Sequence, residues 1–303
     1  MIKEKSCGAI TYKIENGIYY FLIEKMNKGH FSLPKGHVEK GESEVETAYR
    51  EIKEETNLDV IIDENFKEVI SYSPYKDCIK DVVFFVAKVK SEDIKAQEIE
   101  VSEIMFLPFD EAYKKLTHRS DKEVFLKAYL YLICKYIDKI IIIGCPGSGN
   151  SYIARYLKDY SKLPLYHLDN LYWFGDYDHI SEEEFVSKVN KIMSTDKWII
   201  DGHFKSSIED RIKNAQAIIY FNLSGKVCVN GVKHRIKYHS VRDDMPCVEK
   251  VLDKEFEECM LHFKENNHES LLSLFNKYPS NVLTITNKRQ LKEIISFLSK
   301  EVK

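Results

Sequence analysis

The first half of the chain opens with short stretches in which apolar and polar residues alternate, the pattern of half-buried β-strands. Residues 5–12 and 18–24 form two such stretches, and the Asn16-Gly17 dipeptide between them favours the positive φ angles of a hairpin turn. Residues 43–56 instead repeat with helical spacing, with apolar side chains at Val45, Ala48, Tyr49 and Ile52. A β-hairpin followed by an amphipathic helix is therefore predicted. Further strands are expected at 58–62, 67–72 and 81–89, and helices at 110–116 and 122–136, giving an α+β unit with a mixed sheet.

The pattern changes near Asp138, where a continuous apolar run begins at residues 139–143. Such runs are typical of parallel strands that are buried on both faces. Similar short runs at 165–168, 198–200, 217–223 and 282–285 are separated by helical stretches, which is the alternation of a doubly wound parallel sheet. We therefore predict a two-domain α/β protein with domains at residues 1–137 and 138–303.

Composition narrows the class of protein. The 303 residues exceed the usual size of one hydrophobic core, and 44% are hydrophobic and 31% charged, as in soluble globular proteins. No apolar run approaches the roughly 20 residues that span a bilayer, and the first residues lack the apolar core of a signal peptide. Seven cysteines, none in a Cys-x-x-Cys pair, fit a reducing compartment. We expect a cytoplasmic protein without a membrane partner.

The net charge of −3 gives no support for binding long nucleic acids, which usually requires a strong basic excess. Small anionic ligands are compatible with it.

Three glutamates, Glu51, Glu54 and Glu55, lie within about one third of the circumference of the predicted helix, at roughly 100° per residue. Their face adjoins the apolar stripe, so they should line a cleft at the rim of the core. Clustered carboxylates repel one another unless cations neutralise them, and oxygen ligands suit Mg²⁺ or Mn²⁺. The alternative is a solvated acidic helix, the commoner meaning of a Glu-rich helix.

The loop before this helix changes that balance. Together, residues 36–58 resemble the Nudix box, Gly-x5-Glu-x7-Arg-Glu-hydrophobic-x-Glu-Glu-x-Gly-hydrophobic, at every specified position except Asn57, where the family has Gly. Asn tolerates the left-handed conformation that ends a helix, so this departure is mild. The resemblance implies a metal-dependent pyrophosphohydrolase on a Nudix α/β/α sandwich. It implies metal binding by Gly36, Glu51, Glu54 and Glu55, catalysis by Glu54, Glu55 and Arg50, and box-supporting roles for Gly41, Glu42 and Asn57, with Glu42 and Arg50 holding the loop on the helix.

The surroundings of the box narrow the resemblance. Residues 33–42, 71–72 and 82–87 look like the asymmetric diadenosine tetraphosphate hydrolases, a likeness that covers about residues 5–130. This implies water attack on diadenosine tetraphosphate, or a related dinucleoside polyphosphate, to give ATP and AMP. Glu100 would be the further glutamate near the metals, with Glu98 and Glu103 as rivals. Lys35 either meets a substrate phosphate or is a solvated loop lysine, and Phe84 either stacks an adenine or belongs to the core.

A second glycine-rich loop, residues 144–151, follows the buried strand at 139–143 and precedes a predicted helix. This is the setting of a phosphate-binding P-loop, in which backbone N–H groups of residues such as Gly144, Gly147 and Gly149 surround phosphates and a hydroxyl such as that of Ser151 binds Mg²⁺. Asn150 occupies the position of the usual Lys. Without that charge, stabilisation of phosphoryl transfer should be severely weakened. We predict a P-loop with a degenerate Walker A motif.

Residues 165–173 and 198–202, beyond this loop, look like the adenylate-kinase-like topology-modulation proteins, and the likeness spans roughly 139–300. It implies a P-loop kinase-like fold on the doubly wound sheet, with a nucleotide as possible ligand. The residues that it places at the nucleotide or in a mobile lid are Asp169, Asp201, Arg235 and Arg242. For both aspartates, an ordinary loop or capping role is the alternative.

Three other functions fit the sequence. The first unit could hydrolyse another nucleoside diphosphate derivative or an RNA 5′ end. The chain could be a nucleotide-sensing binding protein, since the second loop lacks its Lys. Finally, the second domain could be a working kinase in which a basic residue from elsewhere replaces that Lys.

Overall fold

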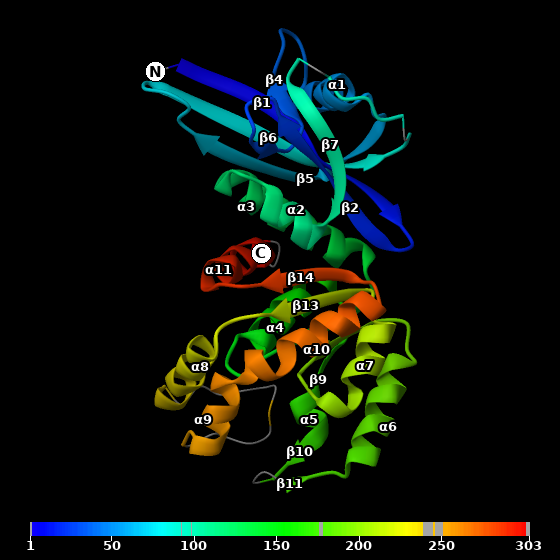
Figure 1. Cartoon of the computed structure of the whole chain (residues 1–303), viewed down its shortest axis with the longest axis vertical. Coiled ribbons are helices and arrows are strands. Elements are labelled where there is room, and N and C mark those ends of the chain that lie inside the picture. Colours follow the sequence, from blue (N-terminus) through cyan, green and yellow to red (C-terminus); the bar gives the residue numbers. More distant parts are fainter. Residues whose placement is uncertain are drawn as a thin grey trace. The chain divides into compact units, whose positions relative to one another are not determined.

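The computed structural model describes residues 2–91, 93–97, 99–175, 178–238, 245 and 251–300. Its residue contacts divide the chain into two compact units, Met1–Leu132 and Ile133–Lys303. Each unit contains its own sheet (Figure 1), and the boundary between the units falls in the last turns of one helix, Arg119–Tyr136.

The first unit is built on one mixed sheet of seven strands. These are β1 (Ile2–Glu15), β2 (Ile18–Met26), β3 (Phe31–Ser32), β4 (Lys35–His37), β5 (Val60–Tyr72), β6 (Cys78–Val89) and β7 (Val101–Pro108). The order is β3-β2-β1-β6-β5, with β4 paired to β1 and β7 to β2. Among the described residues of this sheet, β1 and β6 form the only parallel pair, and the other pairs are antiparallel.

The opening hairpin has the turn that its sequence predicts. Glu15 pairs with Ile18, so Asn16 and Gly17 alone form the connection. Their φ values are 51° and 81°. Two positive φ angles match the twist of the flanking strands, which sets the register of β2 and hence the direction of each of its side chains.

Helices cover both faces of this sheet. Successive strand residues point to opposite faces. Accordingly, Leu22 packs with Ala48 and Ile52 of α1 (Glu44–Thr56). The ring of Phe21 points the other way and contacts Phe109 of α2 (Phe109–Lys115) and residues of α3 (Arg119–Tyr136). The result is an α/β/α arrangement with a mixed sheet.

Three expectations for the first unit differ from the structure. The strands expected at 58–62 and 67–72 are one strand, β5, whose register shifts between Asp63 and Glu68. Strands β3, β4 and β7 were not predicted. Tyr49, expected in the apolar stripe of α1, is 40% exposed, and its hydroxyl donates a hydrogen bond to the Asp59 carboxylate 2.9 Å away.

The second unit is built on a five-stranded parallel sheet. Its strands are β8 (Lys139–Gly144), β9 (Leu165–His167), β12 (Trp198–Asp201), β13 (Ala217–Phe221) and β14 (Asn281–Ile285), in the order β14-β13-β8-β12-β9. The chain fills one side of β8 first and then crosses to the other. A parallel sheet with reversal at its first strand is what the run of short apolar segments predicts.

Helices and a small hairpin connect these strands. The helices are α4 (Asn150–Ser161), α5 (Leu168–Tyr172), α6 (Glu182–Met193), α7 (Lys205–Asn214), α8 (Gly225–Lys237), α9 (Lys254–Leu261), α10 (Phe263–Lys277) and α11 (Lys288–Leu298), and the hairpin is β10 (Trp173–Phe174) with β11 (Asp178–His179). Ile141 and Ile143 pack on one face of the sheet with side chains of α6, α7 and α10. The parallel strands are thus covered by apolar side chains, as parallel sheets require.

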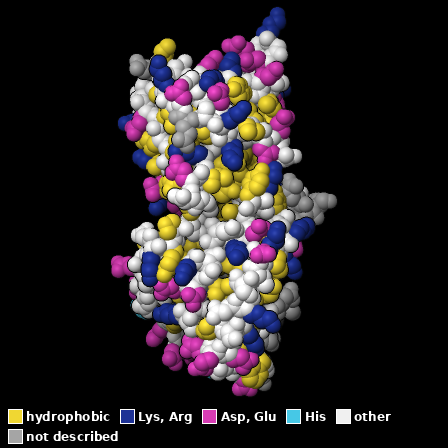
Figure 2. Space-filling view, turned by 90° about the vertical axis from the view of Figure 1, so that its right-hand side faces the viewer, with side chains coloured by type: hydrophobic (Ala, Val, Ile, Leu, Met, Phe, Trp, Pro, Cys, Tyr) yellow, Lys and Arg dark blue, Asp and Glu magenta, His cyan; other side chains and the backbone are white. Residues whose placement is uncertain are grey.

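The surface carries charges of both signs. On the face that Figure 2 shows, Lys and Arg side chains are interspersed with Asp and Glu side chains. Within the described residues, no helix is long and apolar enough to cross a membrane.

Candidate active site

Helix α1 has both ends fixed by local hydrogen bonds. Ser43 and Glu46 form a reciprocal capping box at its first turn. At the other end, Asn57 adopts the left-handed conformation with φ 60°, and its N–H donates to the Lys53 carbonyl. The helix therefore stops where the glutamates end, and their positions along it are defined.

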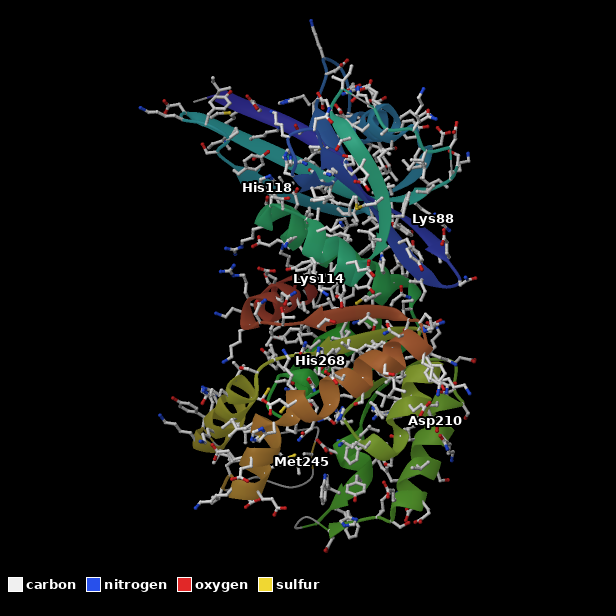
Figure 3. The ribbon with its side chains drawn as sticks, in the orientation of Figure 1. Lys88, Lys114, His118, Asp210, Met245 and His268 are labelled. Carbon is white, nitrogen blue, oxygen red and sulfur yellow. The ribbon has the colours of Figure 1, made fainter. Side chains whose placement is uncertain are left out.

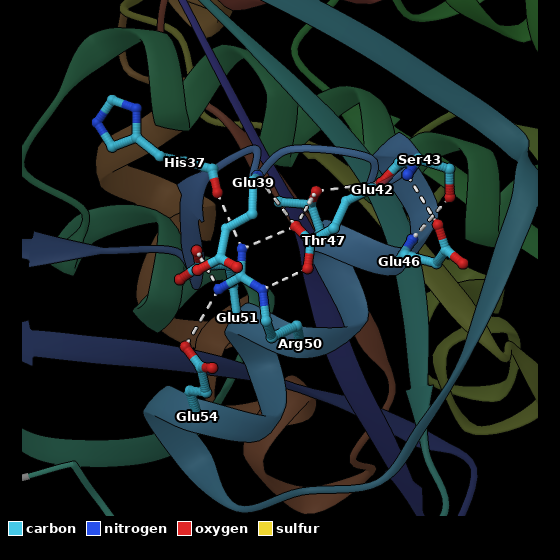
Figure 4. Close-up of polar contacts among 9 residues, drawn as sticks. All are labelled: His37, Glu39, Glu42, Ser43, Glu46, Thr47, Arg50, Glu51 and Glu54. Carbon is cyan, nitrogen blue, oxygen red and sulfur yellow. Dashed lines mark hydrogen bonds and ion pairs between the residues drawn. The ribbon is translucent and has the colours of Figure 1, made fainter.

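Arg50 connects the loop to the acidic face of α1 (Figure 4). Its Nε and Nη2 donate to the two carboxylate oxygens of Glu42 at 2.7 and 3.0 Å, and Nη2 also donates to the His37 carbonyl. Its Nη1 donates to Glu51 and Glu54 at 2.9 and 3.2 Å. The Arg50 guanidinium is the main cause that lowers the pKa of Glu42 to about 2. Arg50 therefore acts here as a positioning residue that orients three carboxylates.

Gly36 allows Glu51 to lie against the loop. Strand β4 pairs with β1, with Gly36 opposite Cys7, and this holds the loop over α1. A Cβ atom on Gly36 would overlap the Glu51 carboxylate. Burial raises the pKa of Glu51, although Arg50 opposes this shift. The close approach of backbone and carboxylate places the Gly36 peptide beside an acidic group.

Glu55 is the most enclosed of the three helix glutamates. It is 4% exposed, and one of its carboxylate oxygens accepts a hydrogen bond from the Lys35 N–H at 3.1 Å. Burial raises its pKa well above the usual range, and the nearby charges of Glu24 and Glu51 raise it further. Glu54, in contrast, has a side chain that is 51% exposed. The three glutamates thus run from water into the protein interior.

Glu24 is a carboxylate of this site that the sequence analysis missed. It lies on β2 and is 0% exposed, and neither carboxylate oxygen has a hydrogen-bond partner. Burial raises its pKa strongly, with Glu100 and Glu51 adding to the shift and Lys35 opposing it. The signal in the sequence was a lone carboxylate directly after the apolar run 21–23.

Lys35 is neither free nor fully solvated. Its ammonium group donates to Ser32 Oγ and to the Leu33 carbonyl, and it lies 3.9 Å from the Asp121 carboxylate. These contacts correct the expectation of a solvated loop lysine. They tie the side chain to its own loop and to α3.

The segment at residues 30–32 is held near α3 as well. The rings of His30 and His118, the latter just before α3 (Figure 3), lie with centroids 5.4 Å apart. Phe31 and Thr117 exchange hydrogen bonds. The loop that carries Lys35 is therefore anchored on both sides.

Glu100 is brought to the site by a loop that covers the end of α1. The Lys95 and Gln97 N–H groups donate to the carbonyls of Thr56 and Glu55. Glu100 itself is exposed, and its charge raises the pKa of both Glu24 and Glu51. Of its rivals, Glu103 is exposed on β7 opposite Lys25, and Glu98 lies outside the described residues.

Phe84 is in the core. The side chain is 0% exposed, on the central strand β6, which is paired on both edges. Its ring has no surface left for an adenine. The core alternative for Phe84 is therefore the one that the structure supports.

The donor groups of this site can be compared with those that hold a divalent cation. Among the described residues, no three His, Cys, Asp or Glu side chains converge as they do in a closed metal centre. The chemistry of the donors nevertheless fits such an ion, because these are carboxylates at or near the interior whose charges disfavour ionisation: Glu24 and Glu51 raise the pKa of Glu55, and Glu51 raises the pKa of Glu24. A bound cation would remove this repulsion.

In the second unit, the glycine-rich loop connects β8 to α4 in a tight turn. The φ angles of Gly147 and Gly149 are 78° and 108°. A Cβ on Gly147 would overlap the Cys228 carbonyl oxygen of α8, so this helix packs directly on the loop. A Cβ on Gly144 would overlap the Phe221 side chain. Glycines are thus required here by packing as well as by φ.

The Asn150 side chain is turned back into this loop. Its Nδ2 donates to the Gly144 carbonyl at 3.3 Å, and its Oδ1 accepts from the Ser148 hydroxyl at 2.5 Å. Ser151 follows it in the first turn of α4 and is partly exposed. The amide therefore supports the loop rather than extending from it.

The remaining predicted residues of the second unit lie on different elements. Asp201, at the end of β12, is 4% exposed, and its carboxylate lies 2.8 Å from His167 Nδ1 on the neighbouring strand β9. Asp169 in α5 and Arg235 in α8 are partly exposed, and Arg242 lies outside the described residues. The sequence analysis did not identify His167.

Comparison with known proteins places the first unit. The NUDIX domain model matches residues 15–129. A bis(5′-nucleosyl)-tetraphosphatase [asymmetrical] from Sus scrofa is 31% identical over 140 residues, which cover 42% of this chain and 95% of that protein. The enzyme of the same name from Rattus norvegicus is 34% identical over 102 residues, 30% of this chain and 69% of that protein.

A solved structure of C. elegans Ap4A hydrolase in a binary complex is 27% identical and covers 43% of this chain and 97% of its own, with a TM-score of 0.40. A score at this level adds no weight of its own, and the assignment rests on the sequence matches. The family is known for using divalent cations, in keeping with the carboxylates gathered around α1. Through its first unit, this chain belongs to the Nudix hydrolase family.

Proposed function

We propose that the first unit is a metal-dependent pyrophosphohydrolase that cleaves a dinucleoside polyphosphate, such as diadenosine tetraphosphate, to ATP and AMP. The observation that carries the proposal is the group of carboxylates on and around α1, in which Glu55 is buried and Arg50 orients Glu51 and Glu54. The substrate class is supported by the relatives, since the Sus scrofa protein of that name matches over 95% of its length.

Glu51, Glu54, Glu55 and the Gly36 carbonyl would hold the cation, which we propose to be Mg²⁺ or Mn²⁺. When bound, such an ion polarises a phosphoryl oxygen and lowers the pKa of a coordinated water. Oxygen-only donors of this kind suit both ions. We place Glu100 beside them because its charge already acts on Glu51.

The residues of the chain supply orientation and proton transfer. Arg50 holds Glu42, Glu51 and Glu54 in one network, which fixes the loop on α1 before substrate binds. The Glu54 carboxylate is the group best placed to accept a proton from the attacking water, because half of its side chain reaches solvent while Arg50 orients it. Preorganisation of this kind lowers the cost of reaching the transition state.

The test is a product assay. The purified protein is incubated with diadenosine tetraphosphate and Mg²⁺ in ¹⁸O-labelled water, and products are separated and weighed by mass spectrometry. We expect ATP and AMP with one ¹⁸O in a single product, and no turnover in EDTA. Two molecules of ADP, or turnover of other nucleoside diphosphate derivatives only, would contradict the substrate. Metal-independent turnover would contradict the mechanism.

We also propose that the boundary predicted between residues 137 and 138 separates two domains that act independently. A fragment of residues 1–136 retains all of α3 and every carboxylate of the site. It should fold and keep the hydrolase activity of the full chain. A folded but inactive fragment would show that the second unit completes the site.

For the second unit, we propose a P-loop domain with a degenerate loop that binds phosphate groups weakly and does not transfer them. The order of the parallel sheet and the glycine turn before α4 support binding. The uncharged Asn150, occupied by bonds to Gly144 and Ser148, argues against transfer. Incubation with ATP and a panel of nucleoside and nucleotide acceptors should give no phosphorylated product.

A further inference from the structure

We propose that Glu24 is an additional carboxylate ligand of the divalent-cation site, contributed by the sheet to a site otherwise built on α1 and its loop. This inference rests on the proposed metal-dependent function. It assigns a role to a residue that lies outside the acidic motif, 27 positions before Glu51 by the numbering.

Burial sets Glu24 apart from an ordinary strand residue. The residue is 0% exposed, and both of its carboxylate oxygens lack a hydrogen-bond partner. A buried carboxylate without partners is costly, and such groups in proteins are normally paired or bind metal ions. Glu24 therefore has two oxygens available for a ligand.

The pleat of β2 directs Glu24 to the side of the sheet where α1 lies. Leu22 packs with Ala48 and Ile52 of α1, and residues two apart on a strand share a face. At Glu24, β2 is paired on both edges, with Ser32 of β3 and Ile104 of β7, so the regular alternation of side chains extends to this residue. The side chain consequently faces the helix that carries Glu51 and Glu55.

Glu24 also interacts electrostatically with carboxylates of that helix. Glu51 and Glu100 act on Glu24, and Glu24 in turn is the first charge acting on Glu55. Lys35 is the one nearby cation that acts on Glu24 among the described residues, and its ammonium group is bound to Ser32, Leu33 and Asp121. A divalent ion bound by Glu24 would pair with two carboxylate oxygens that no protein donor contacts.

A purely structural role explains these features poorly. At a fully buried position that faces an apolar helix stripe, a glutamate without partners destabilises the fold relative to an uncharged residue of the same size. A ligand role accounts for the carboxylate, because the cation offsets its burial. The two roles make opposite predictions for the protein without metal.

The experiment measures Mn²⁺ binding to the full chain by the electron paramagnetic resonance signal of free Mn²⁺. We expect Glu24→Gln to weaken binding by about tenfold to hundredfold, a range typical of groups that support a metal site. Glu24→Asp, which keeps the charge on a shorter side chain, should fall between Gln and the wild type. Glu64 is an exposed carboxylate of β5, and Glu64→Gln is therefore the matched control, which should bind Mn²⁺ as the wild type does.

Thermal melting with and without Mn²⁺ distinguishes a ligand role of Glu24 from a purely structural role. Without metal, Glu24→Gln should melt no lower than the wild type, while the rise in melting temperature caused by Mn²⁺ should shrink. The inference is overturned if Glu24→Gln and Glu24→Asp bind Mn²⁺ with wild-type affinity, whether or not they melt earlier. If Glu24→Gln does not fold, the Asp variant alone decides. A wild type that binds no Mn²⁺ would overturn the proposed function along with this inference.

Discussion

Two glycine-containing loops in this protein connect a sheet to the start of a helix. They differ in whether the polar side chains around them already have hydrogen-bond partners. In the first unit, the loop over α1 leaves carboxylates without enough partners. Glu24 has none, and Glu55 accepts one hydrogen bond from a backbone N–H. In the second unit, Asn150 bonds to Gly144 and Ser148 within its own loop.

This difference shows that the ability of a motif to bind a ligand depends on which contacts its polar atoms already make. Buried polar groups that pair with one another stabilise a loop and leave little for a ligand. Buried charges that repel one another destabilise the fold until a cation binds, so they are poised for binding. By this criterion, the first loop has the features expected of a ligand site, and the second loop has those of a structural turn that would hold a phosphate only weakly.

The largest expected effect comes from removing one charge of the first site. Glu55→Gln or Glu54→Gln should lower turnover of the nucleotide substrate by about two to four orders of magnitude, as expected when a metal ligand or base is lost. Steady-state kinetics measure the loss, and circular dichroism checks the fold. Glu64→Gln, which changes the same charge on the exposed face of β5, should have no effect. Near-normal turnover in both Gln variants would mean that these residues were wrongly assigned.

The next effect concerns the close approach of loop and helix. Gly36→Ala places a Cβ against the Glu51 carboxylate and should reduce kcat by about a hundredfold, because small displacements in an active site are costly. Gly29→Ala is the control: its φ is +88° but nothing lies within 4 Å of the added atom. It should cost some stability and leave kcat intact. Equal kcat values for the two variants would show that the Gly36 contact has no catalytic importance.

A smaller effect is expected from loosening the arginine network. Arg50→Lys keeps the charge but loses the paired hydrogen bonds to Glu42, and we expect turnover to fall by about tenfold. Arg119→Lys, in an exposed pair with Glu123, provides the comparison and should behave as the wild type. If Arg50→Lys is fully active, one positive charge suffices and the geometry of the guanidinium is not needed.

The smallest effect tests the second loop. Asn150→Lys should tighten ATP binding by about tenfold, because a charge-assisted contact replaces an amide that is held within the loop. Isothermal titration calorimetry on the full chain, with the first site inactivated by Glu55→Gln, measures it. Phosphoryl transfer should stay undetectable in both forms. Failure of either form to bind would show that the loop is structural, and transfer by the Asn150 form would reveal another basic residue acting in place of Lys.

Local patterns in the sequence were sufficient for much of this protein. The Asn16-Gly17 turn, the helix that begins after Ser43 and the left-handed Asn57 follow from preferences of single residues and their neighbours. The apolar runs of the second unit likewise predicted its parallel strands, because burial on both faces leaves no polar alternation. The acidic motif could also be recognised from local sequence, because its residues lie within one loop and one helix.

The tertiary structure decided what distant segments bring together. Glu24 enters the site because the hairpin register turns its side chain toward α1, which no local pattern in β2 indicates. Phe84 is excluded from it because packing on the sheet buries its ring completely. The tertiary structure also determines the contacts of Asn150, because its amide bonds to Gly144 and Ser148 only in the folded loop. Residue type gives the chemistry that a group can perform, but burial and neighbours, which are set by packing between elements far apart in the chain, determine whether it is available.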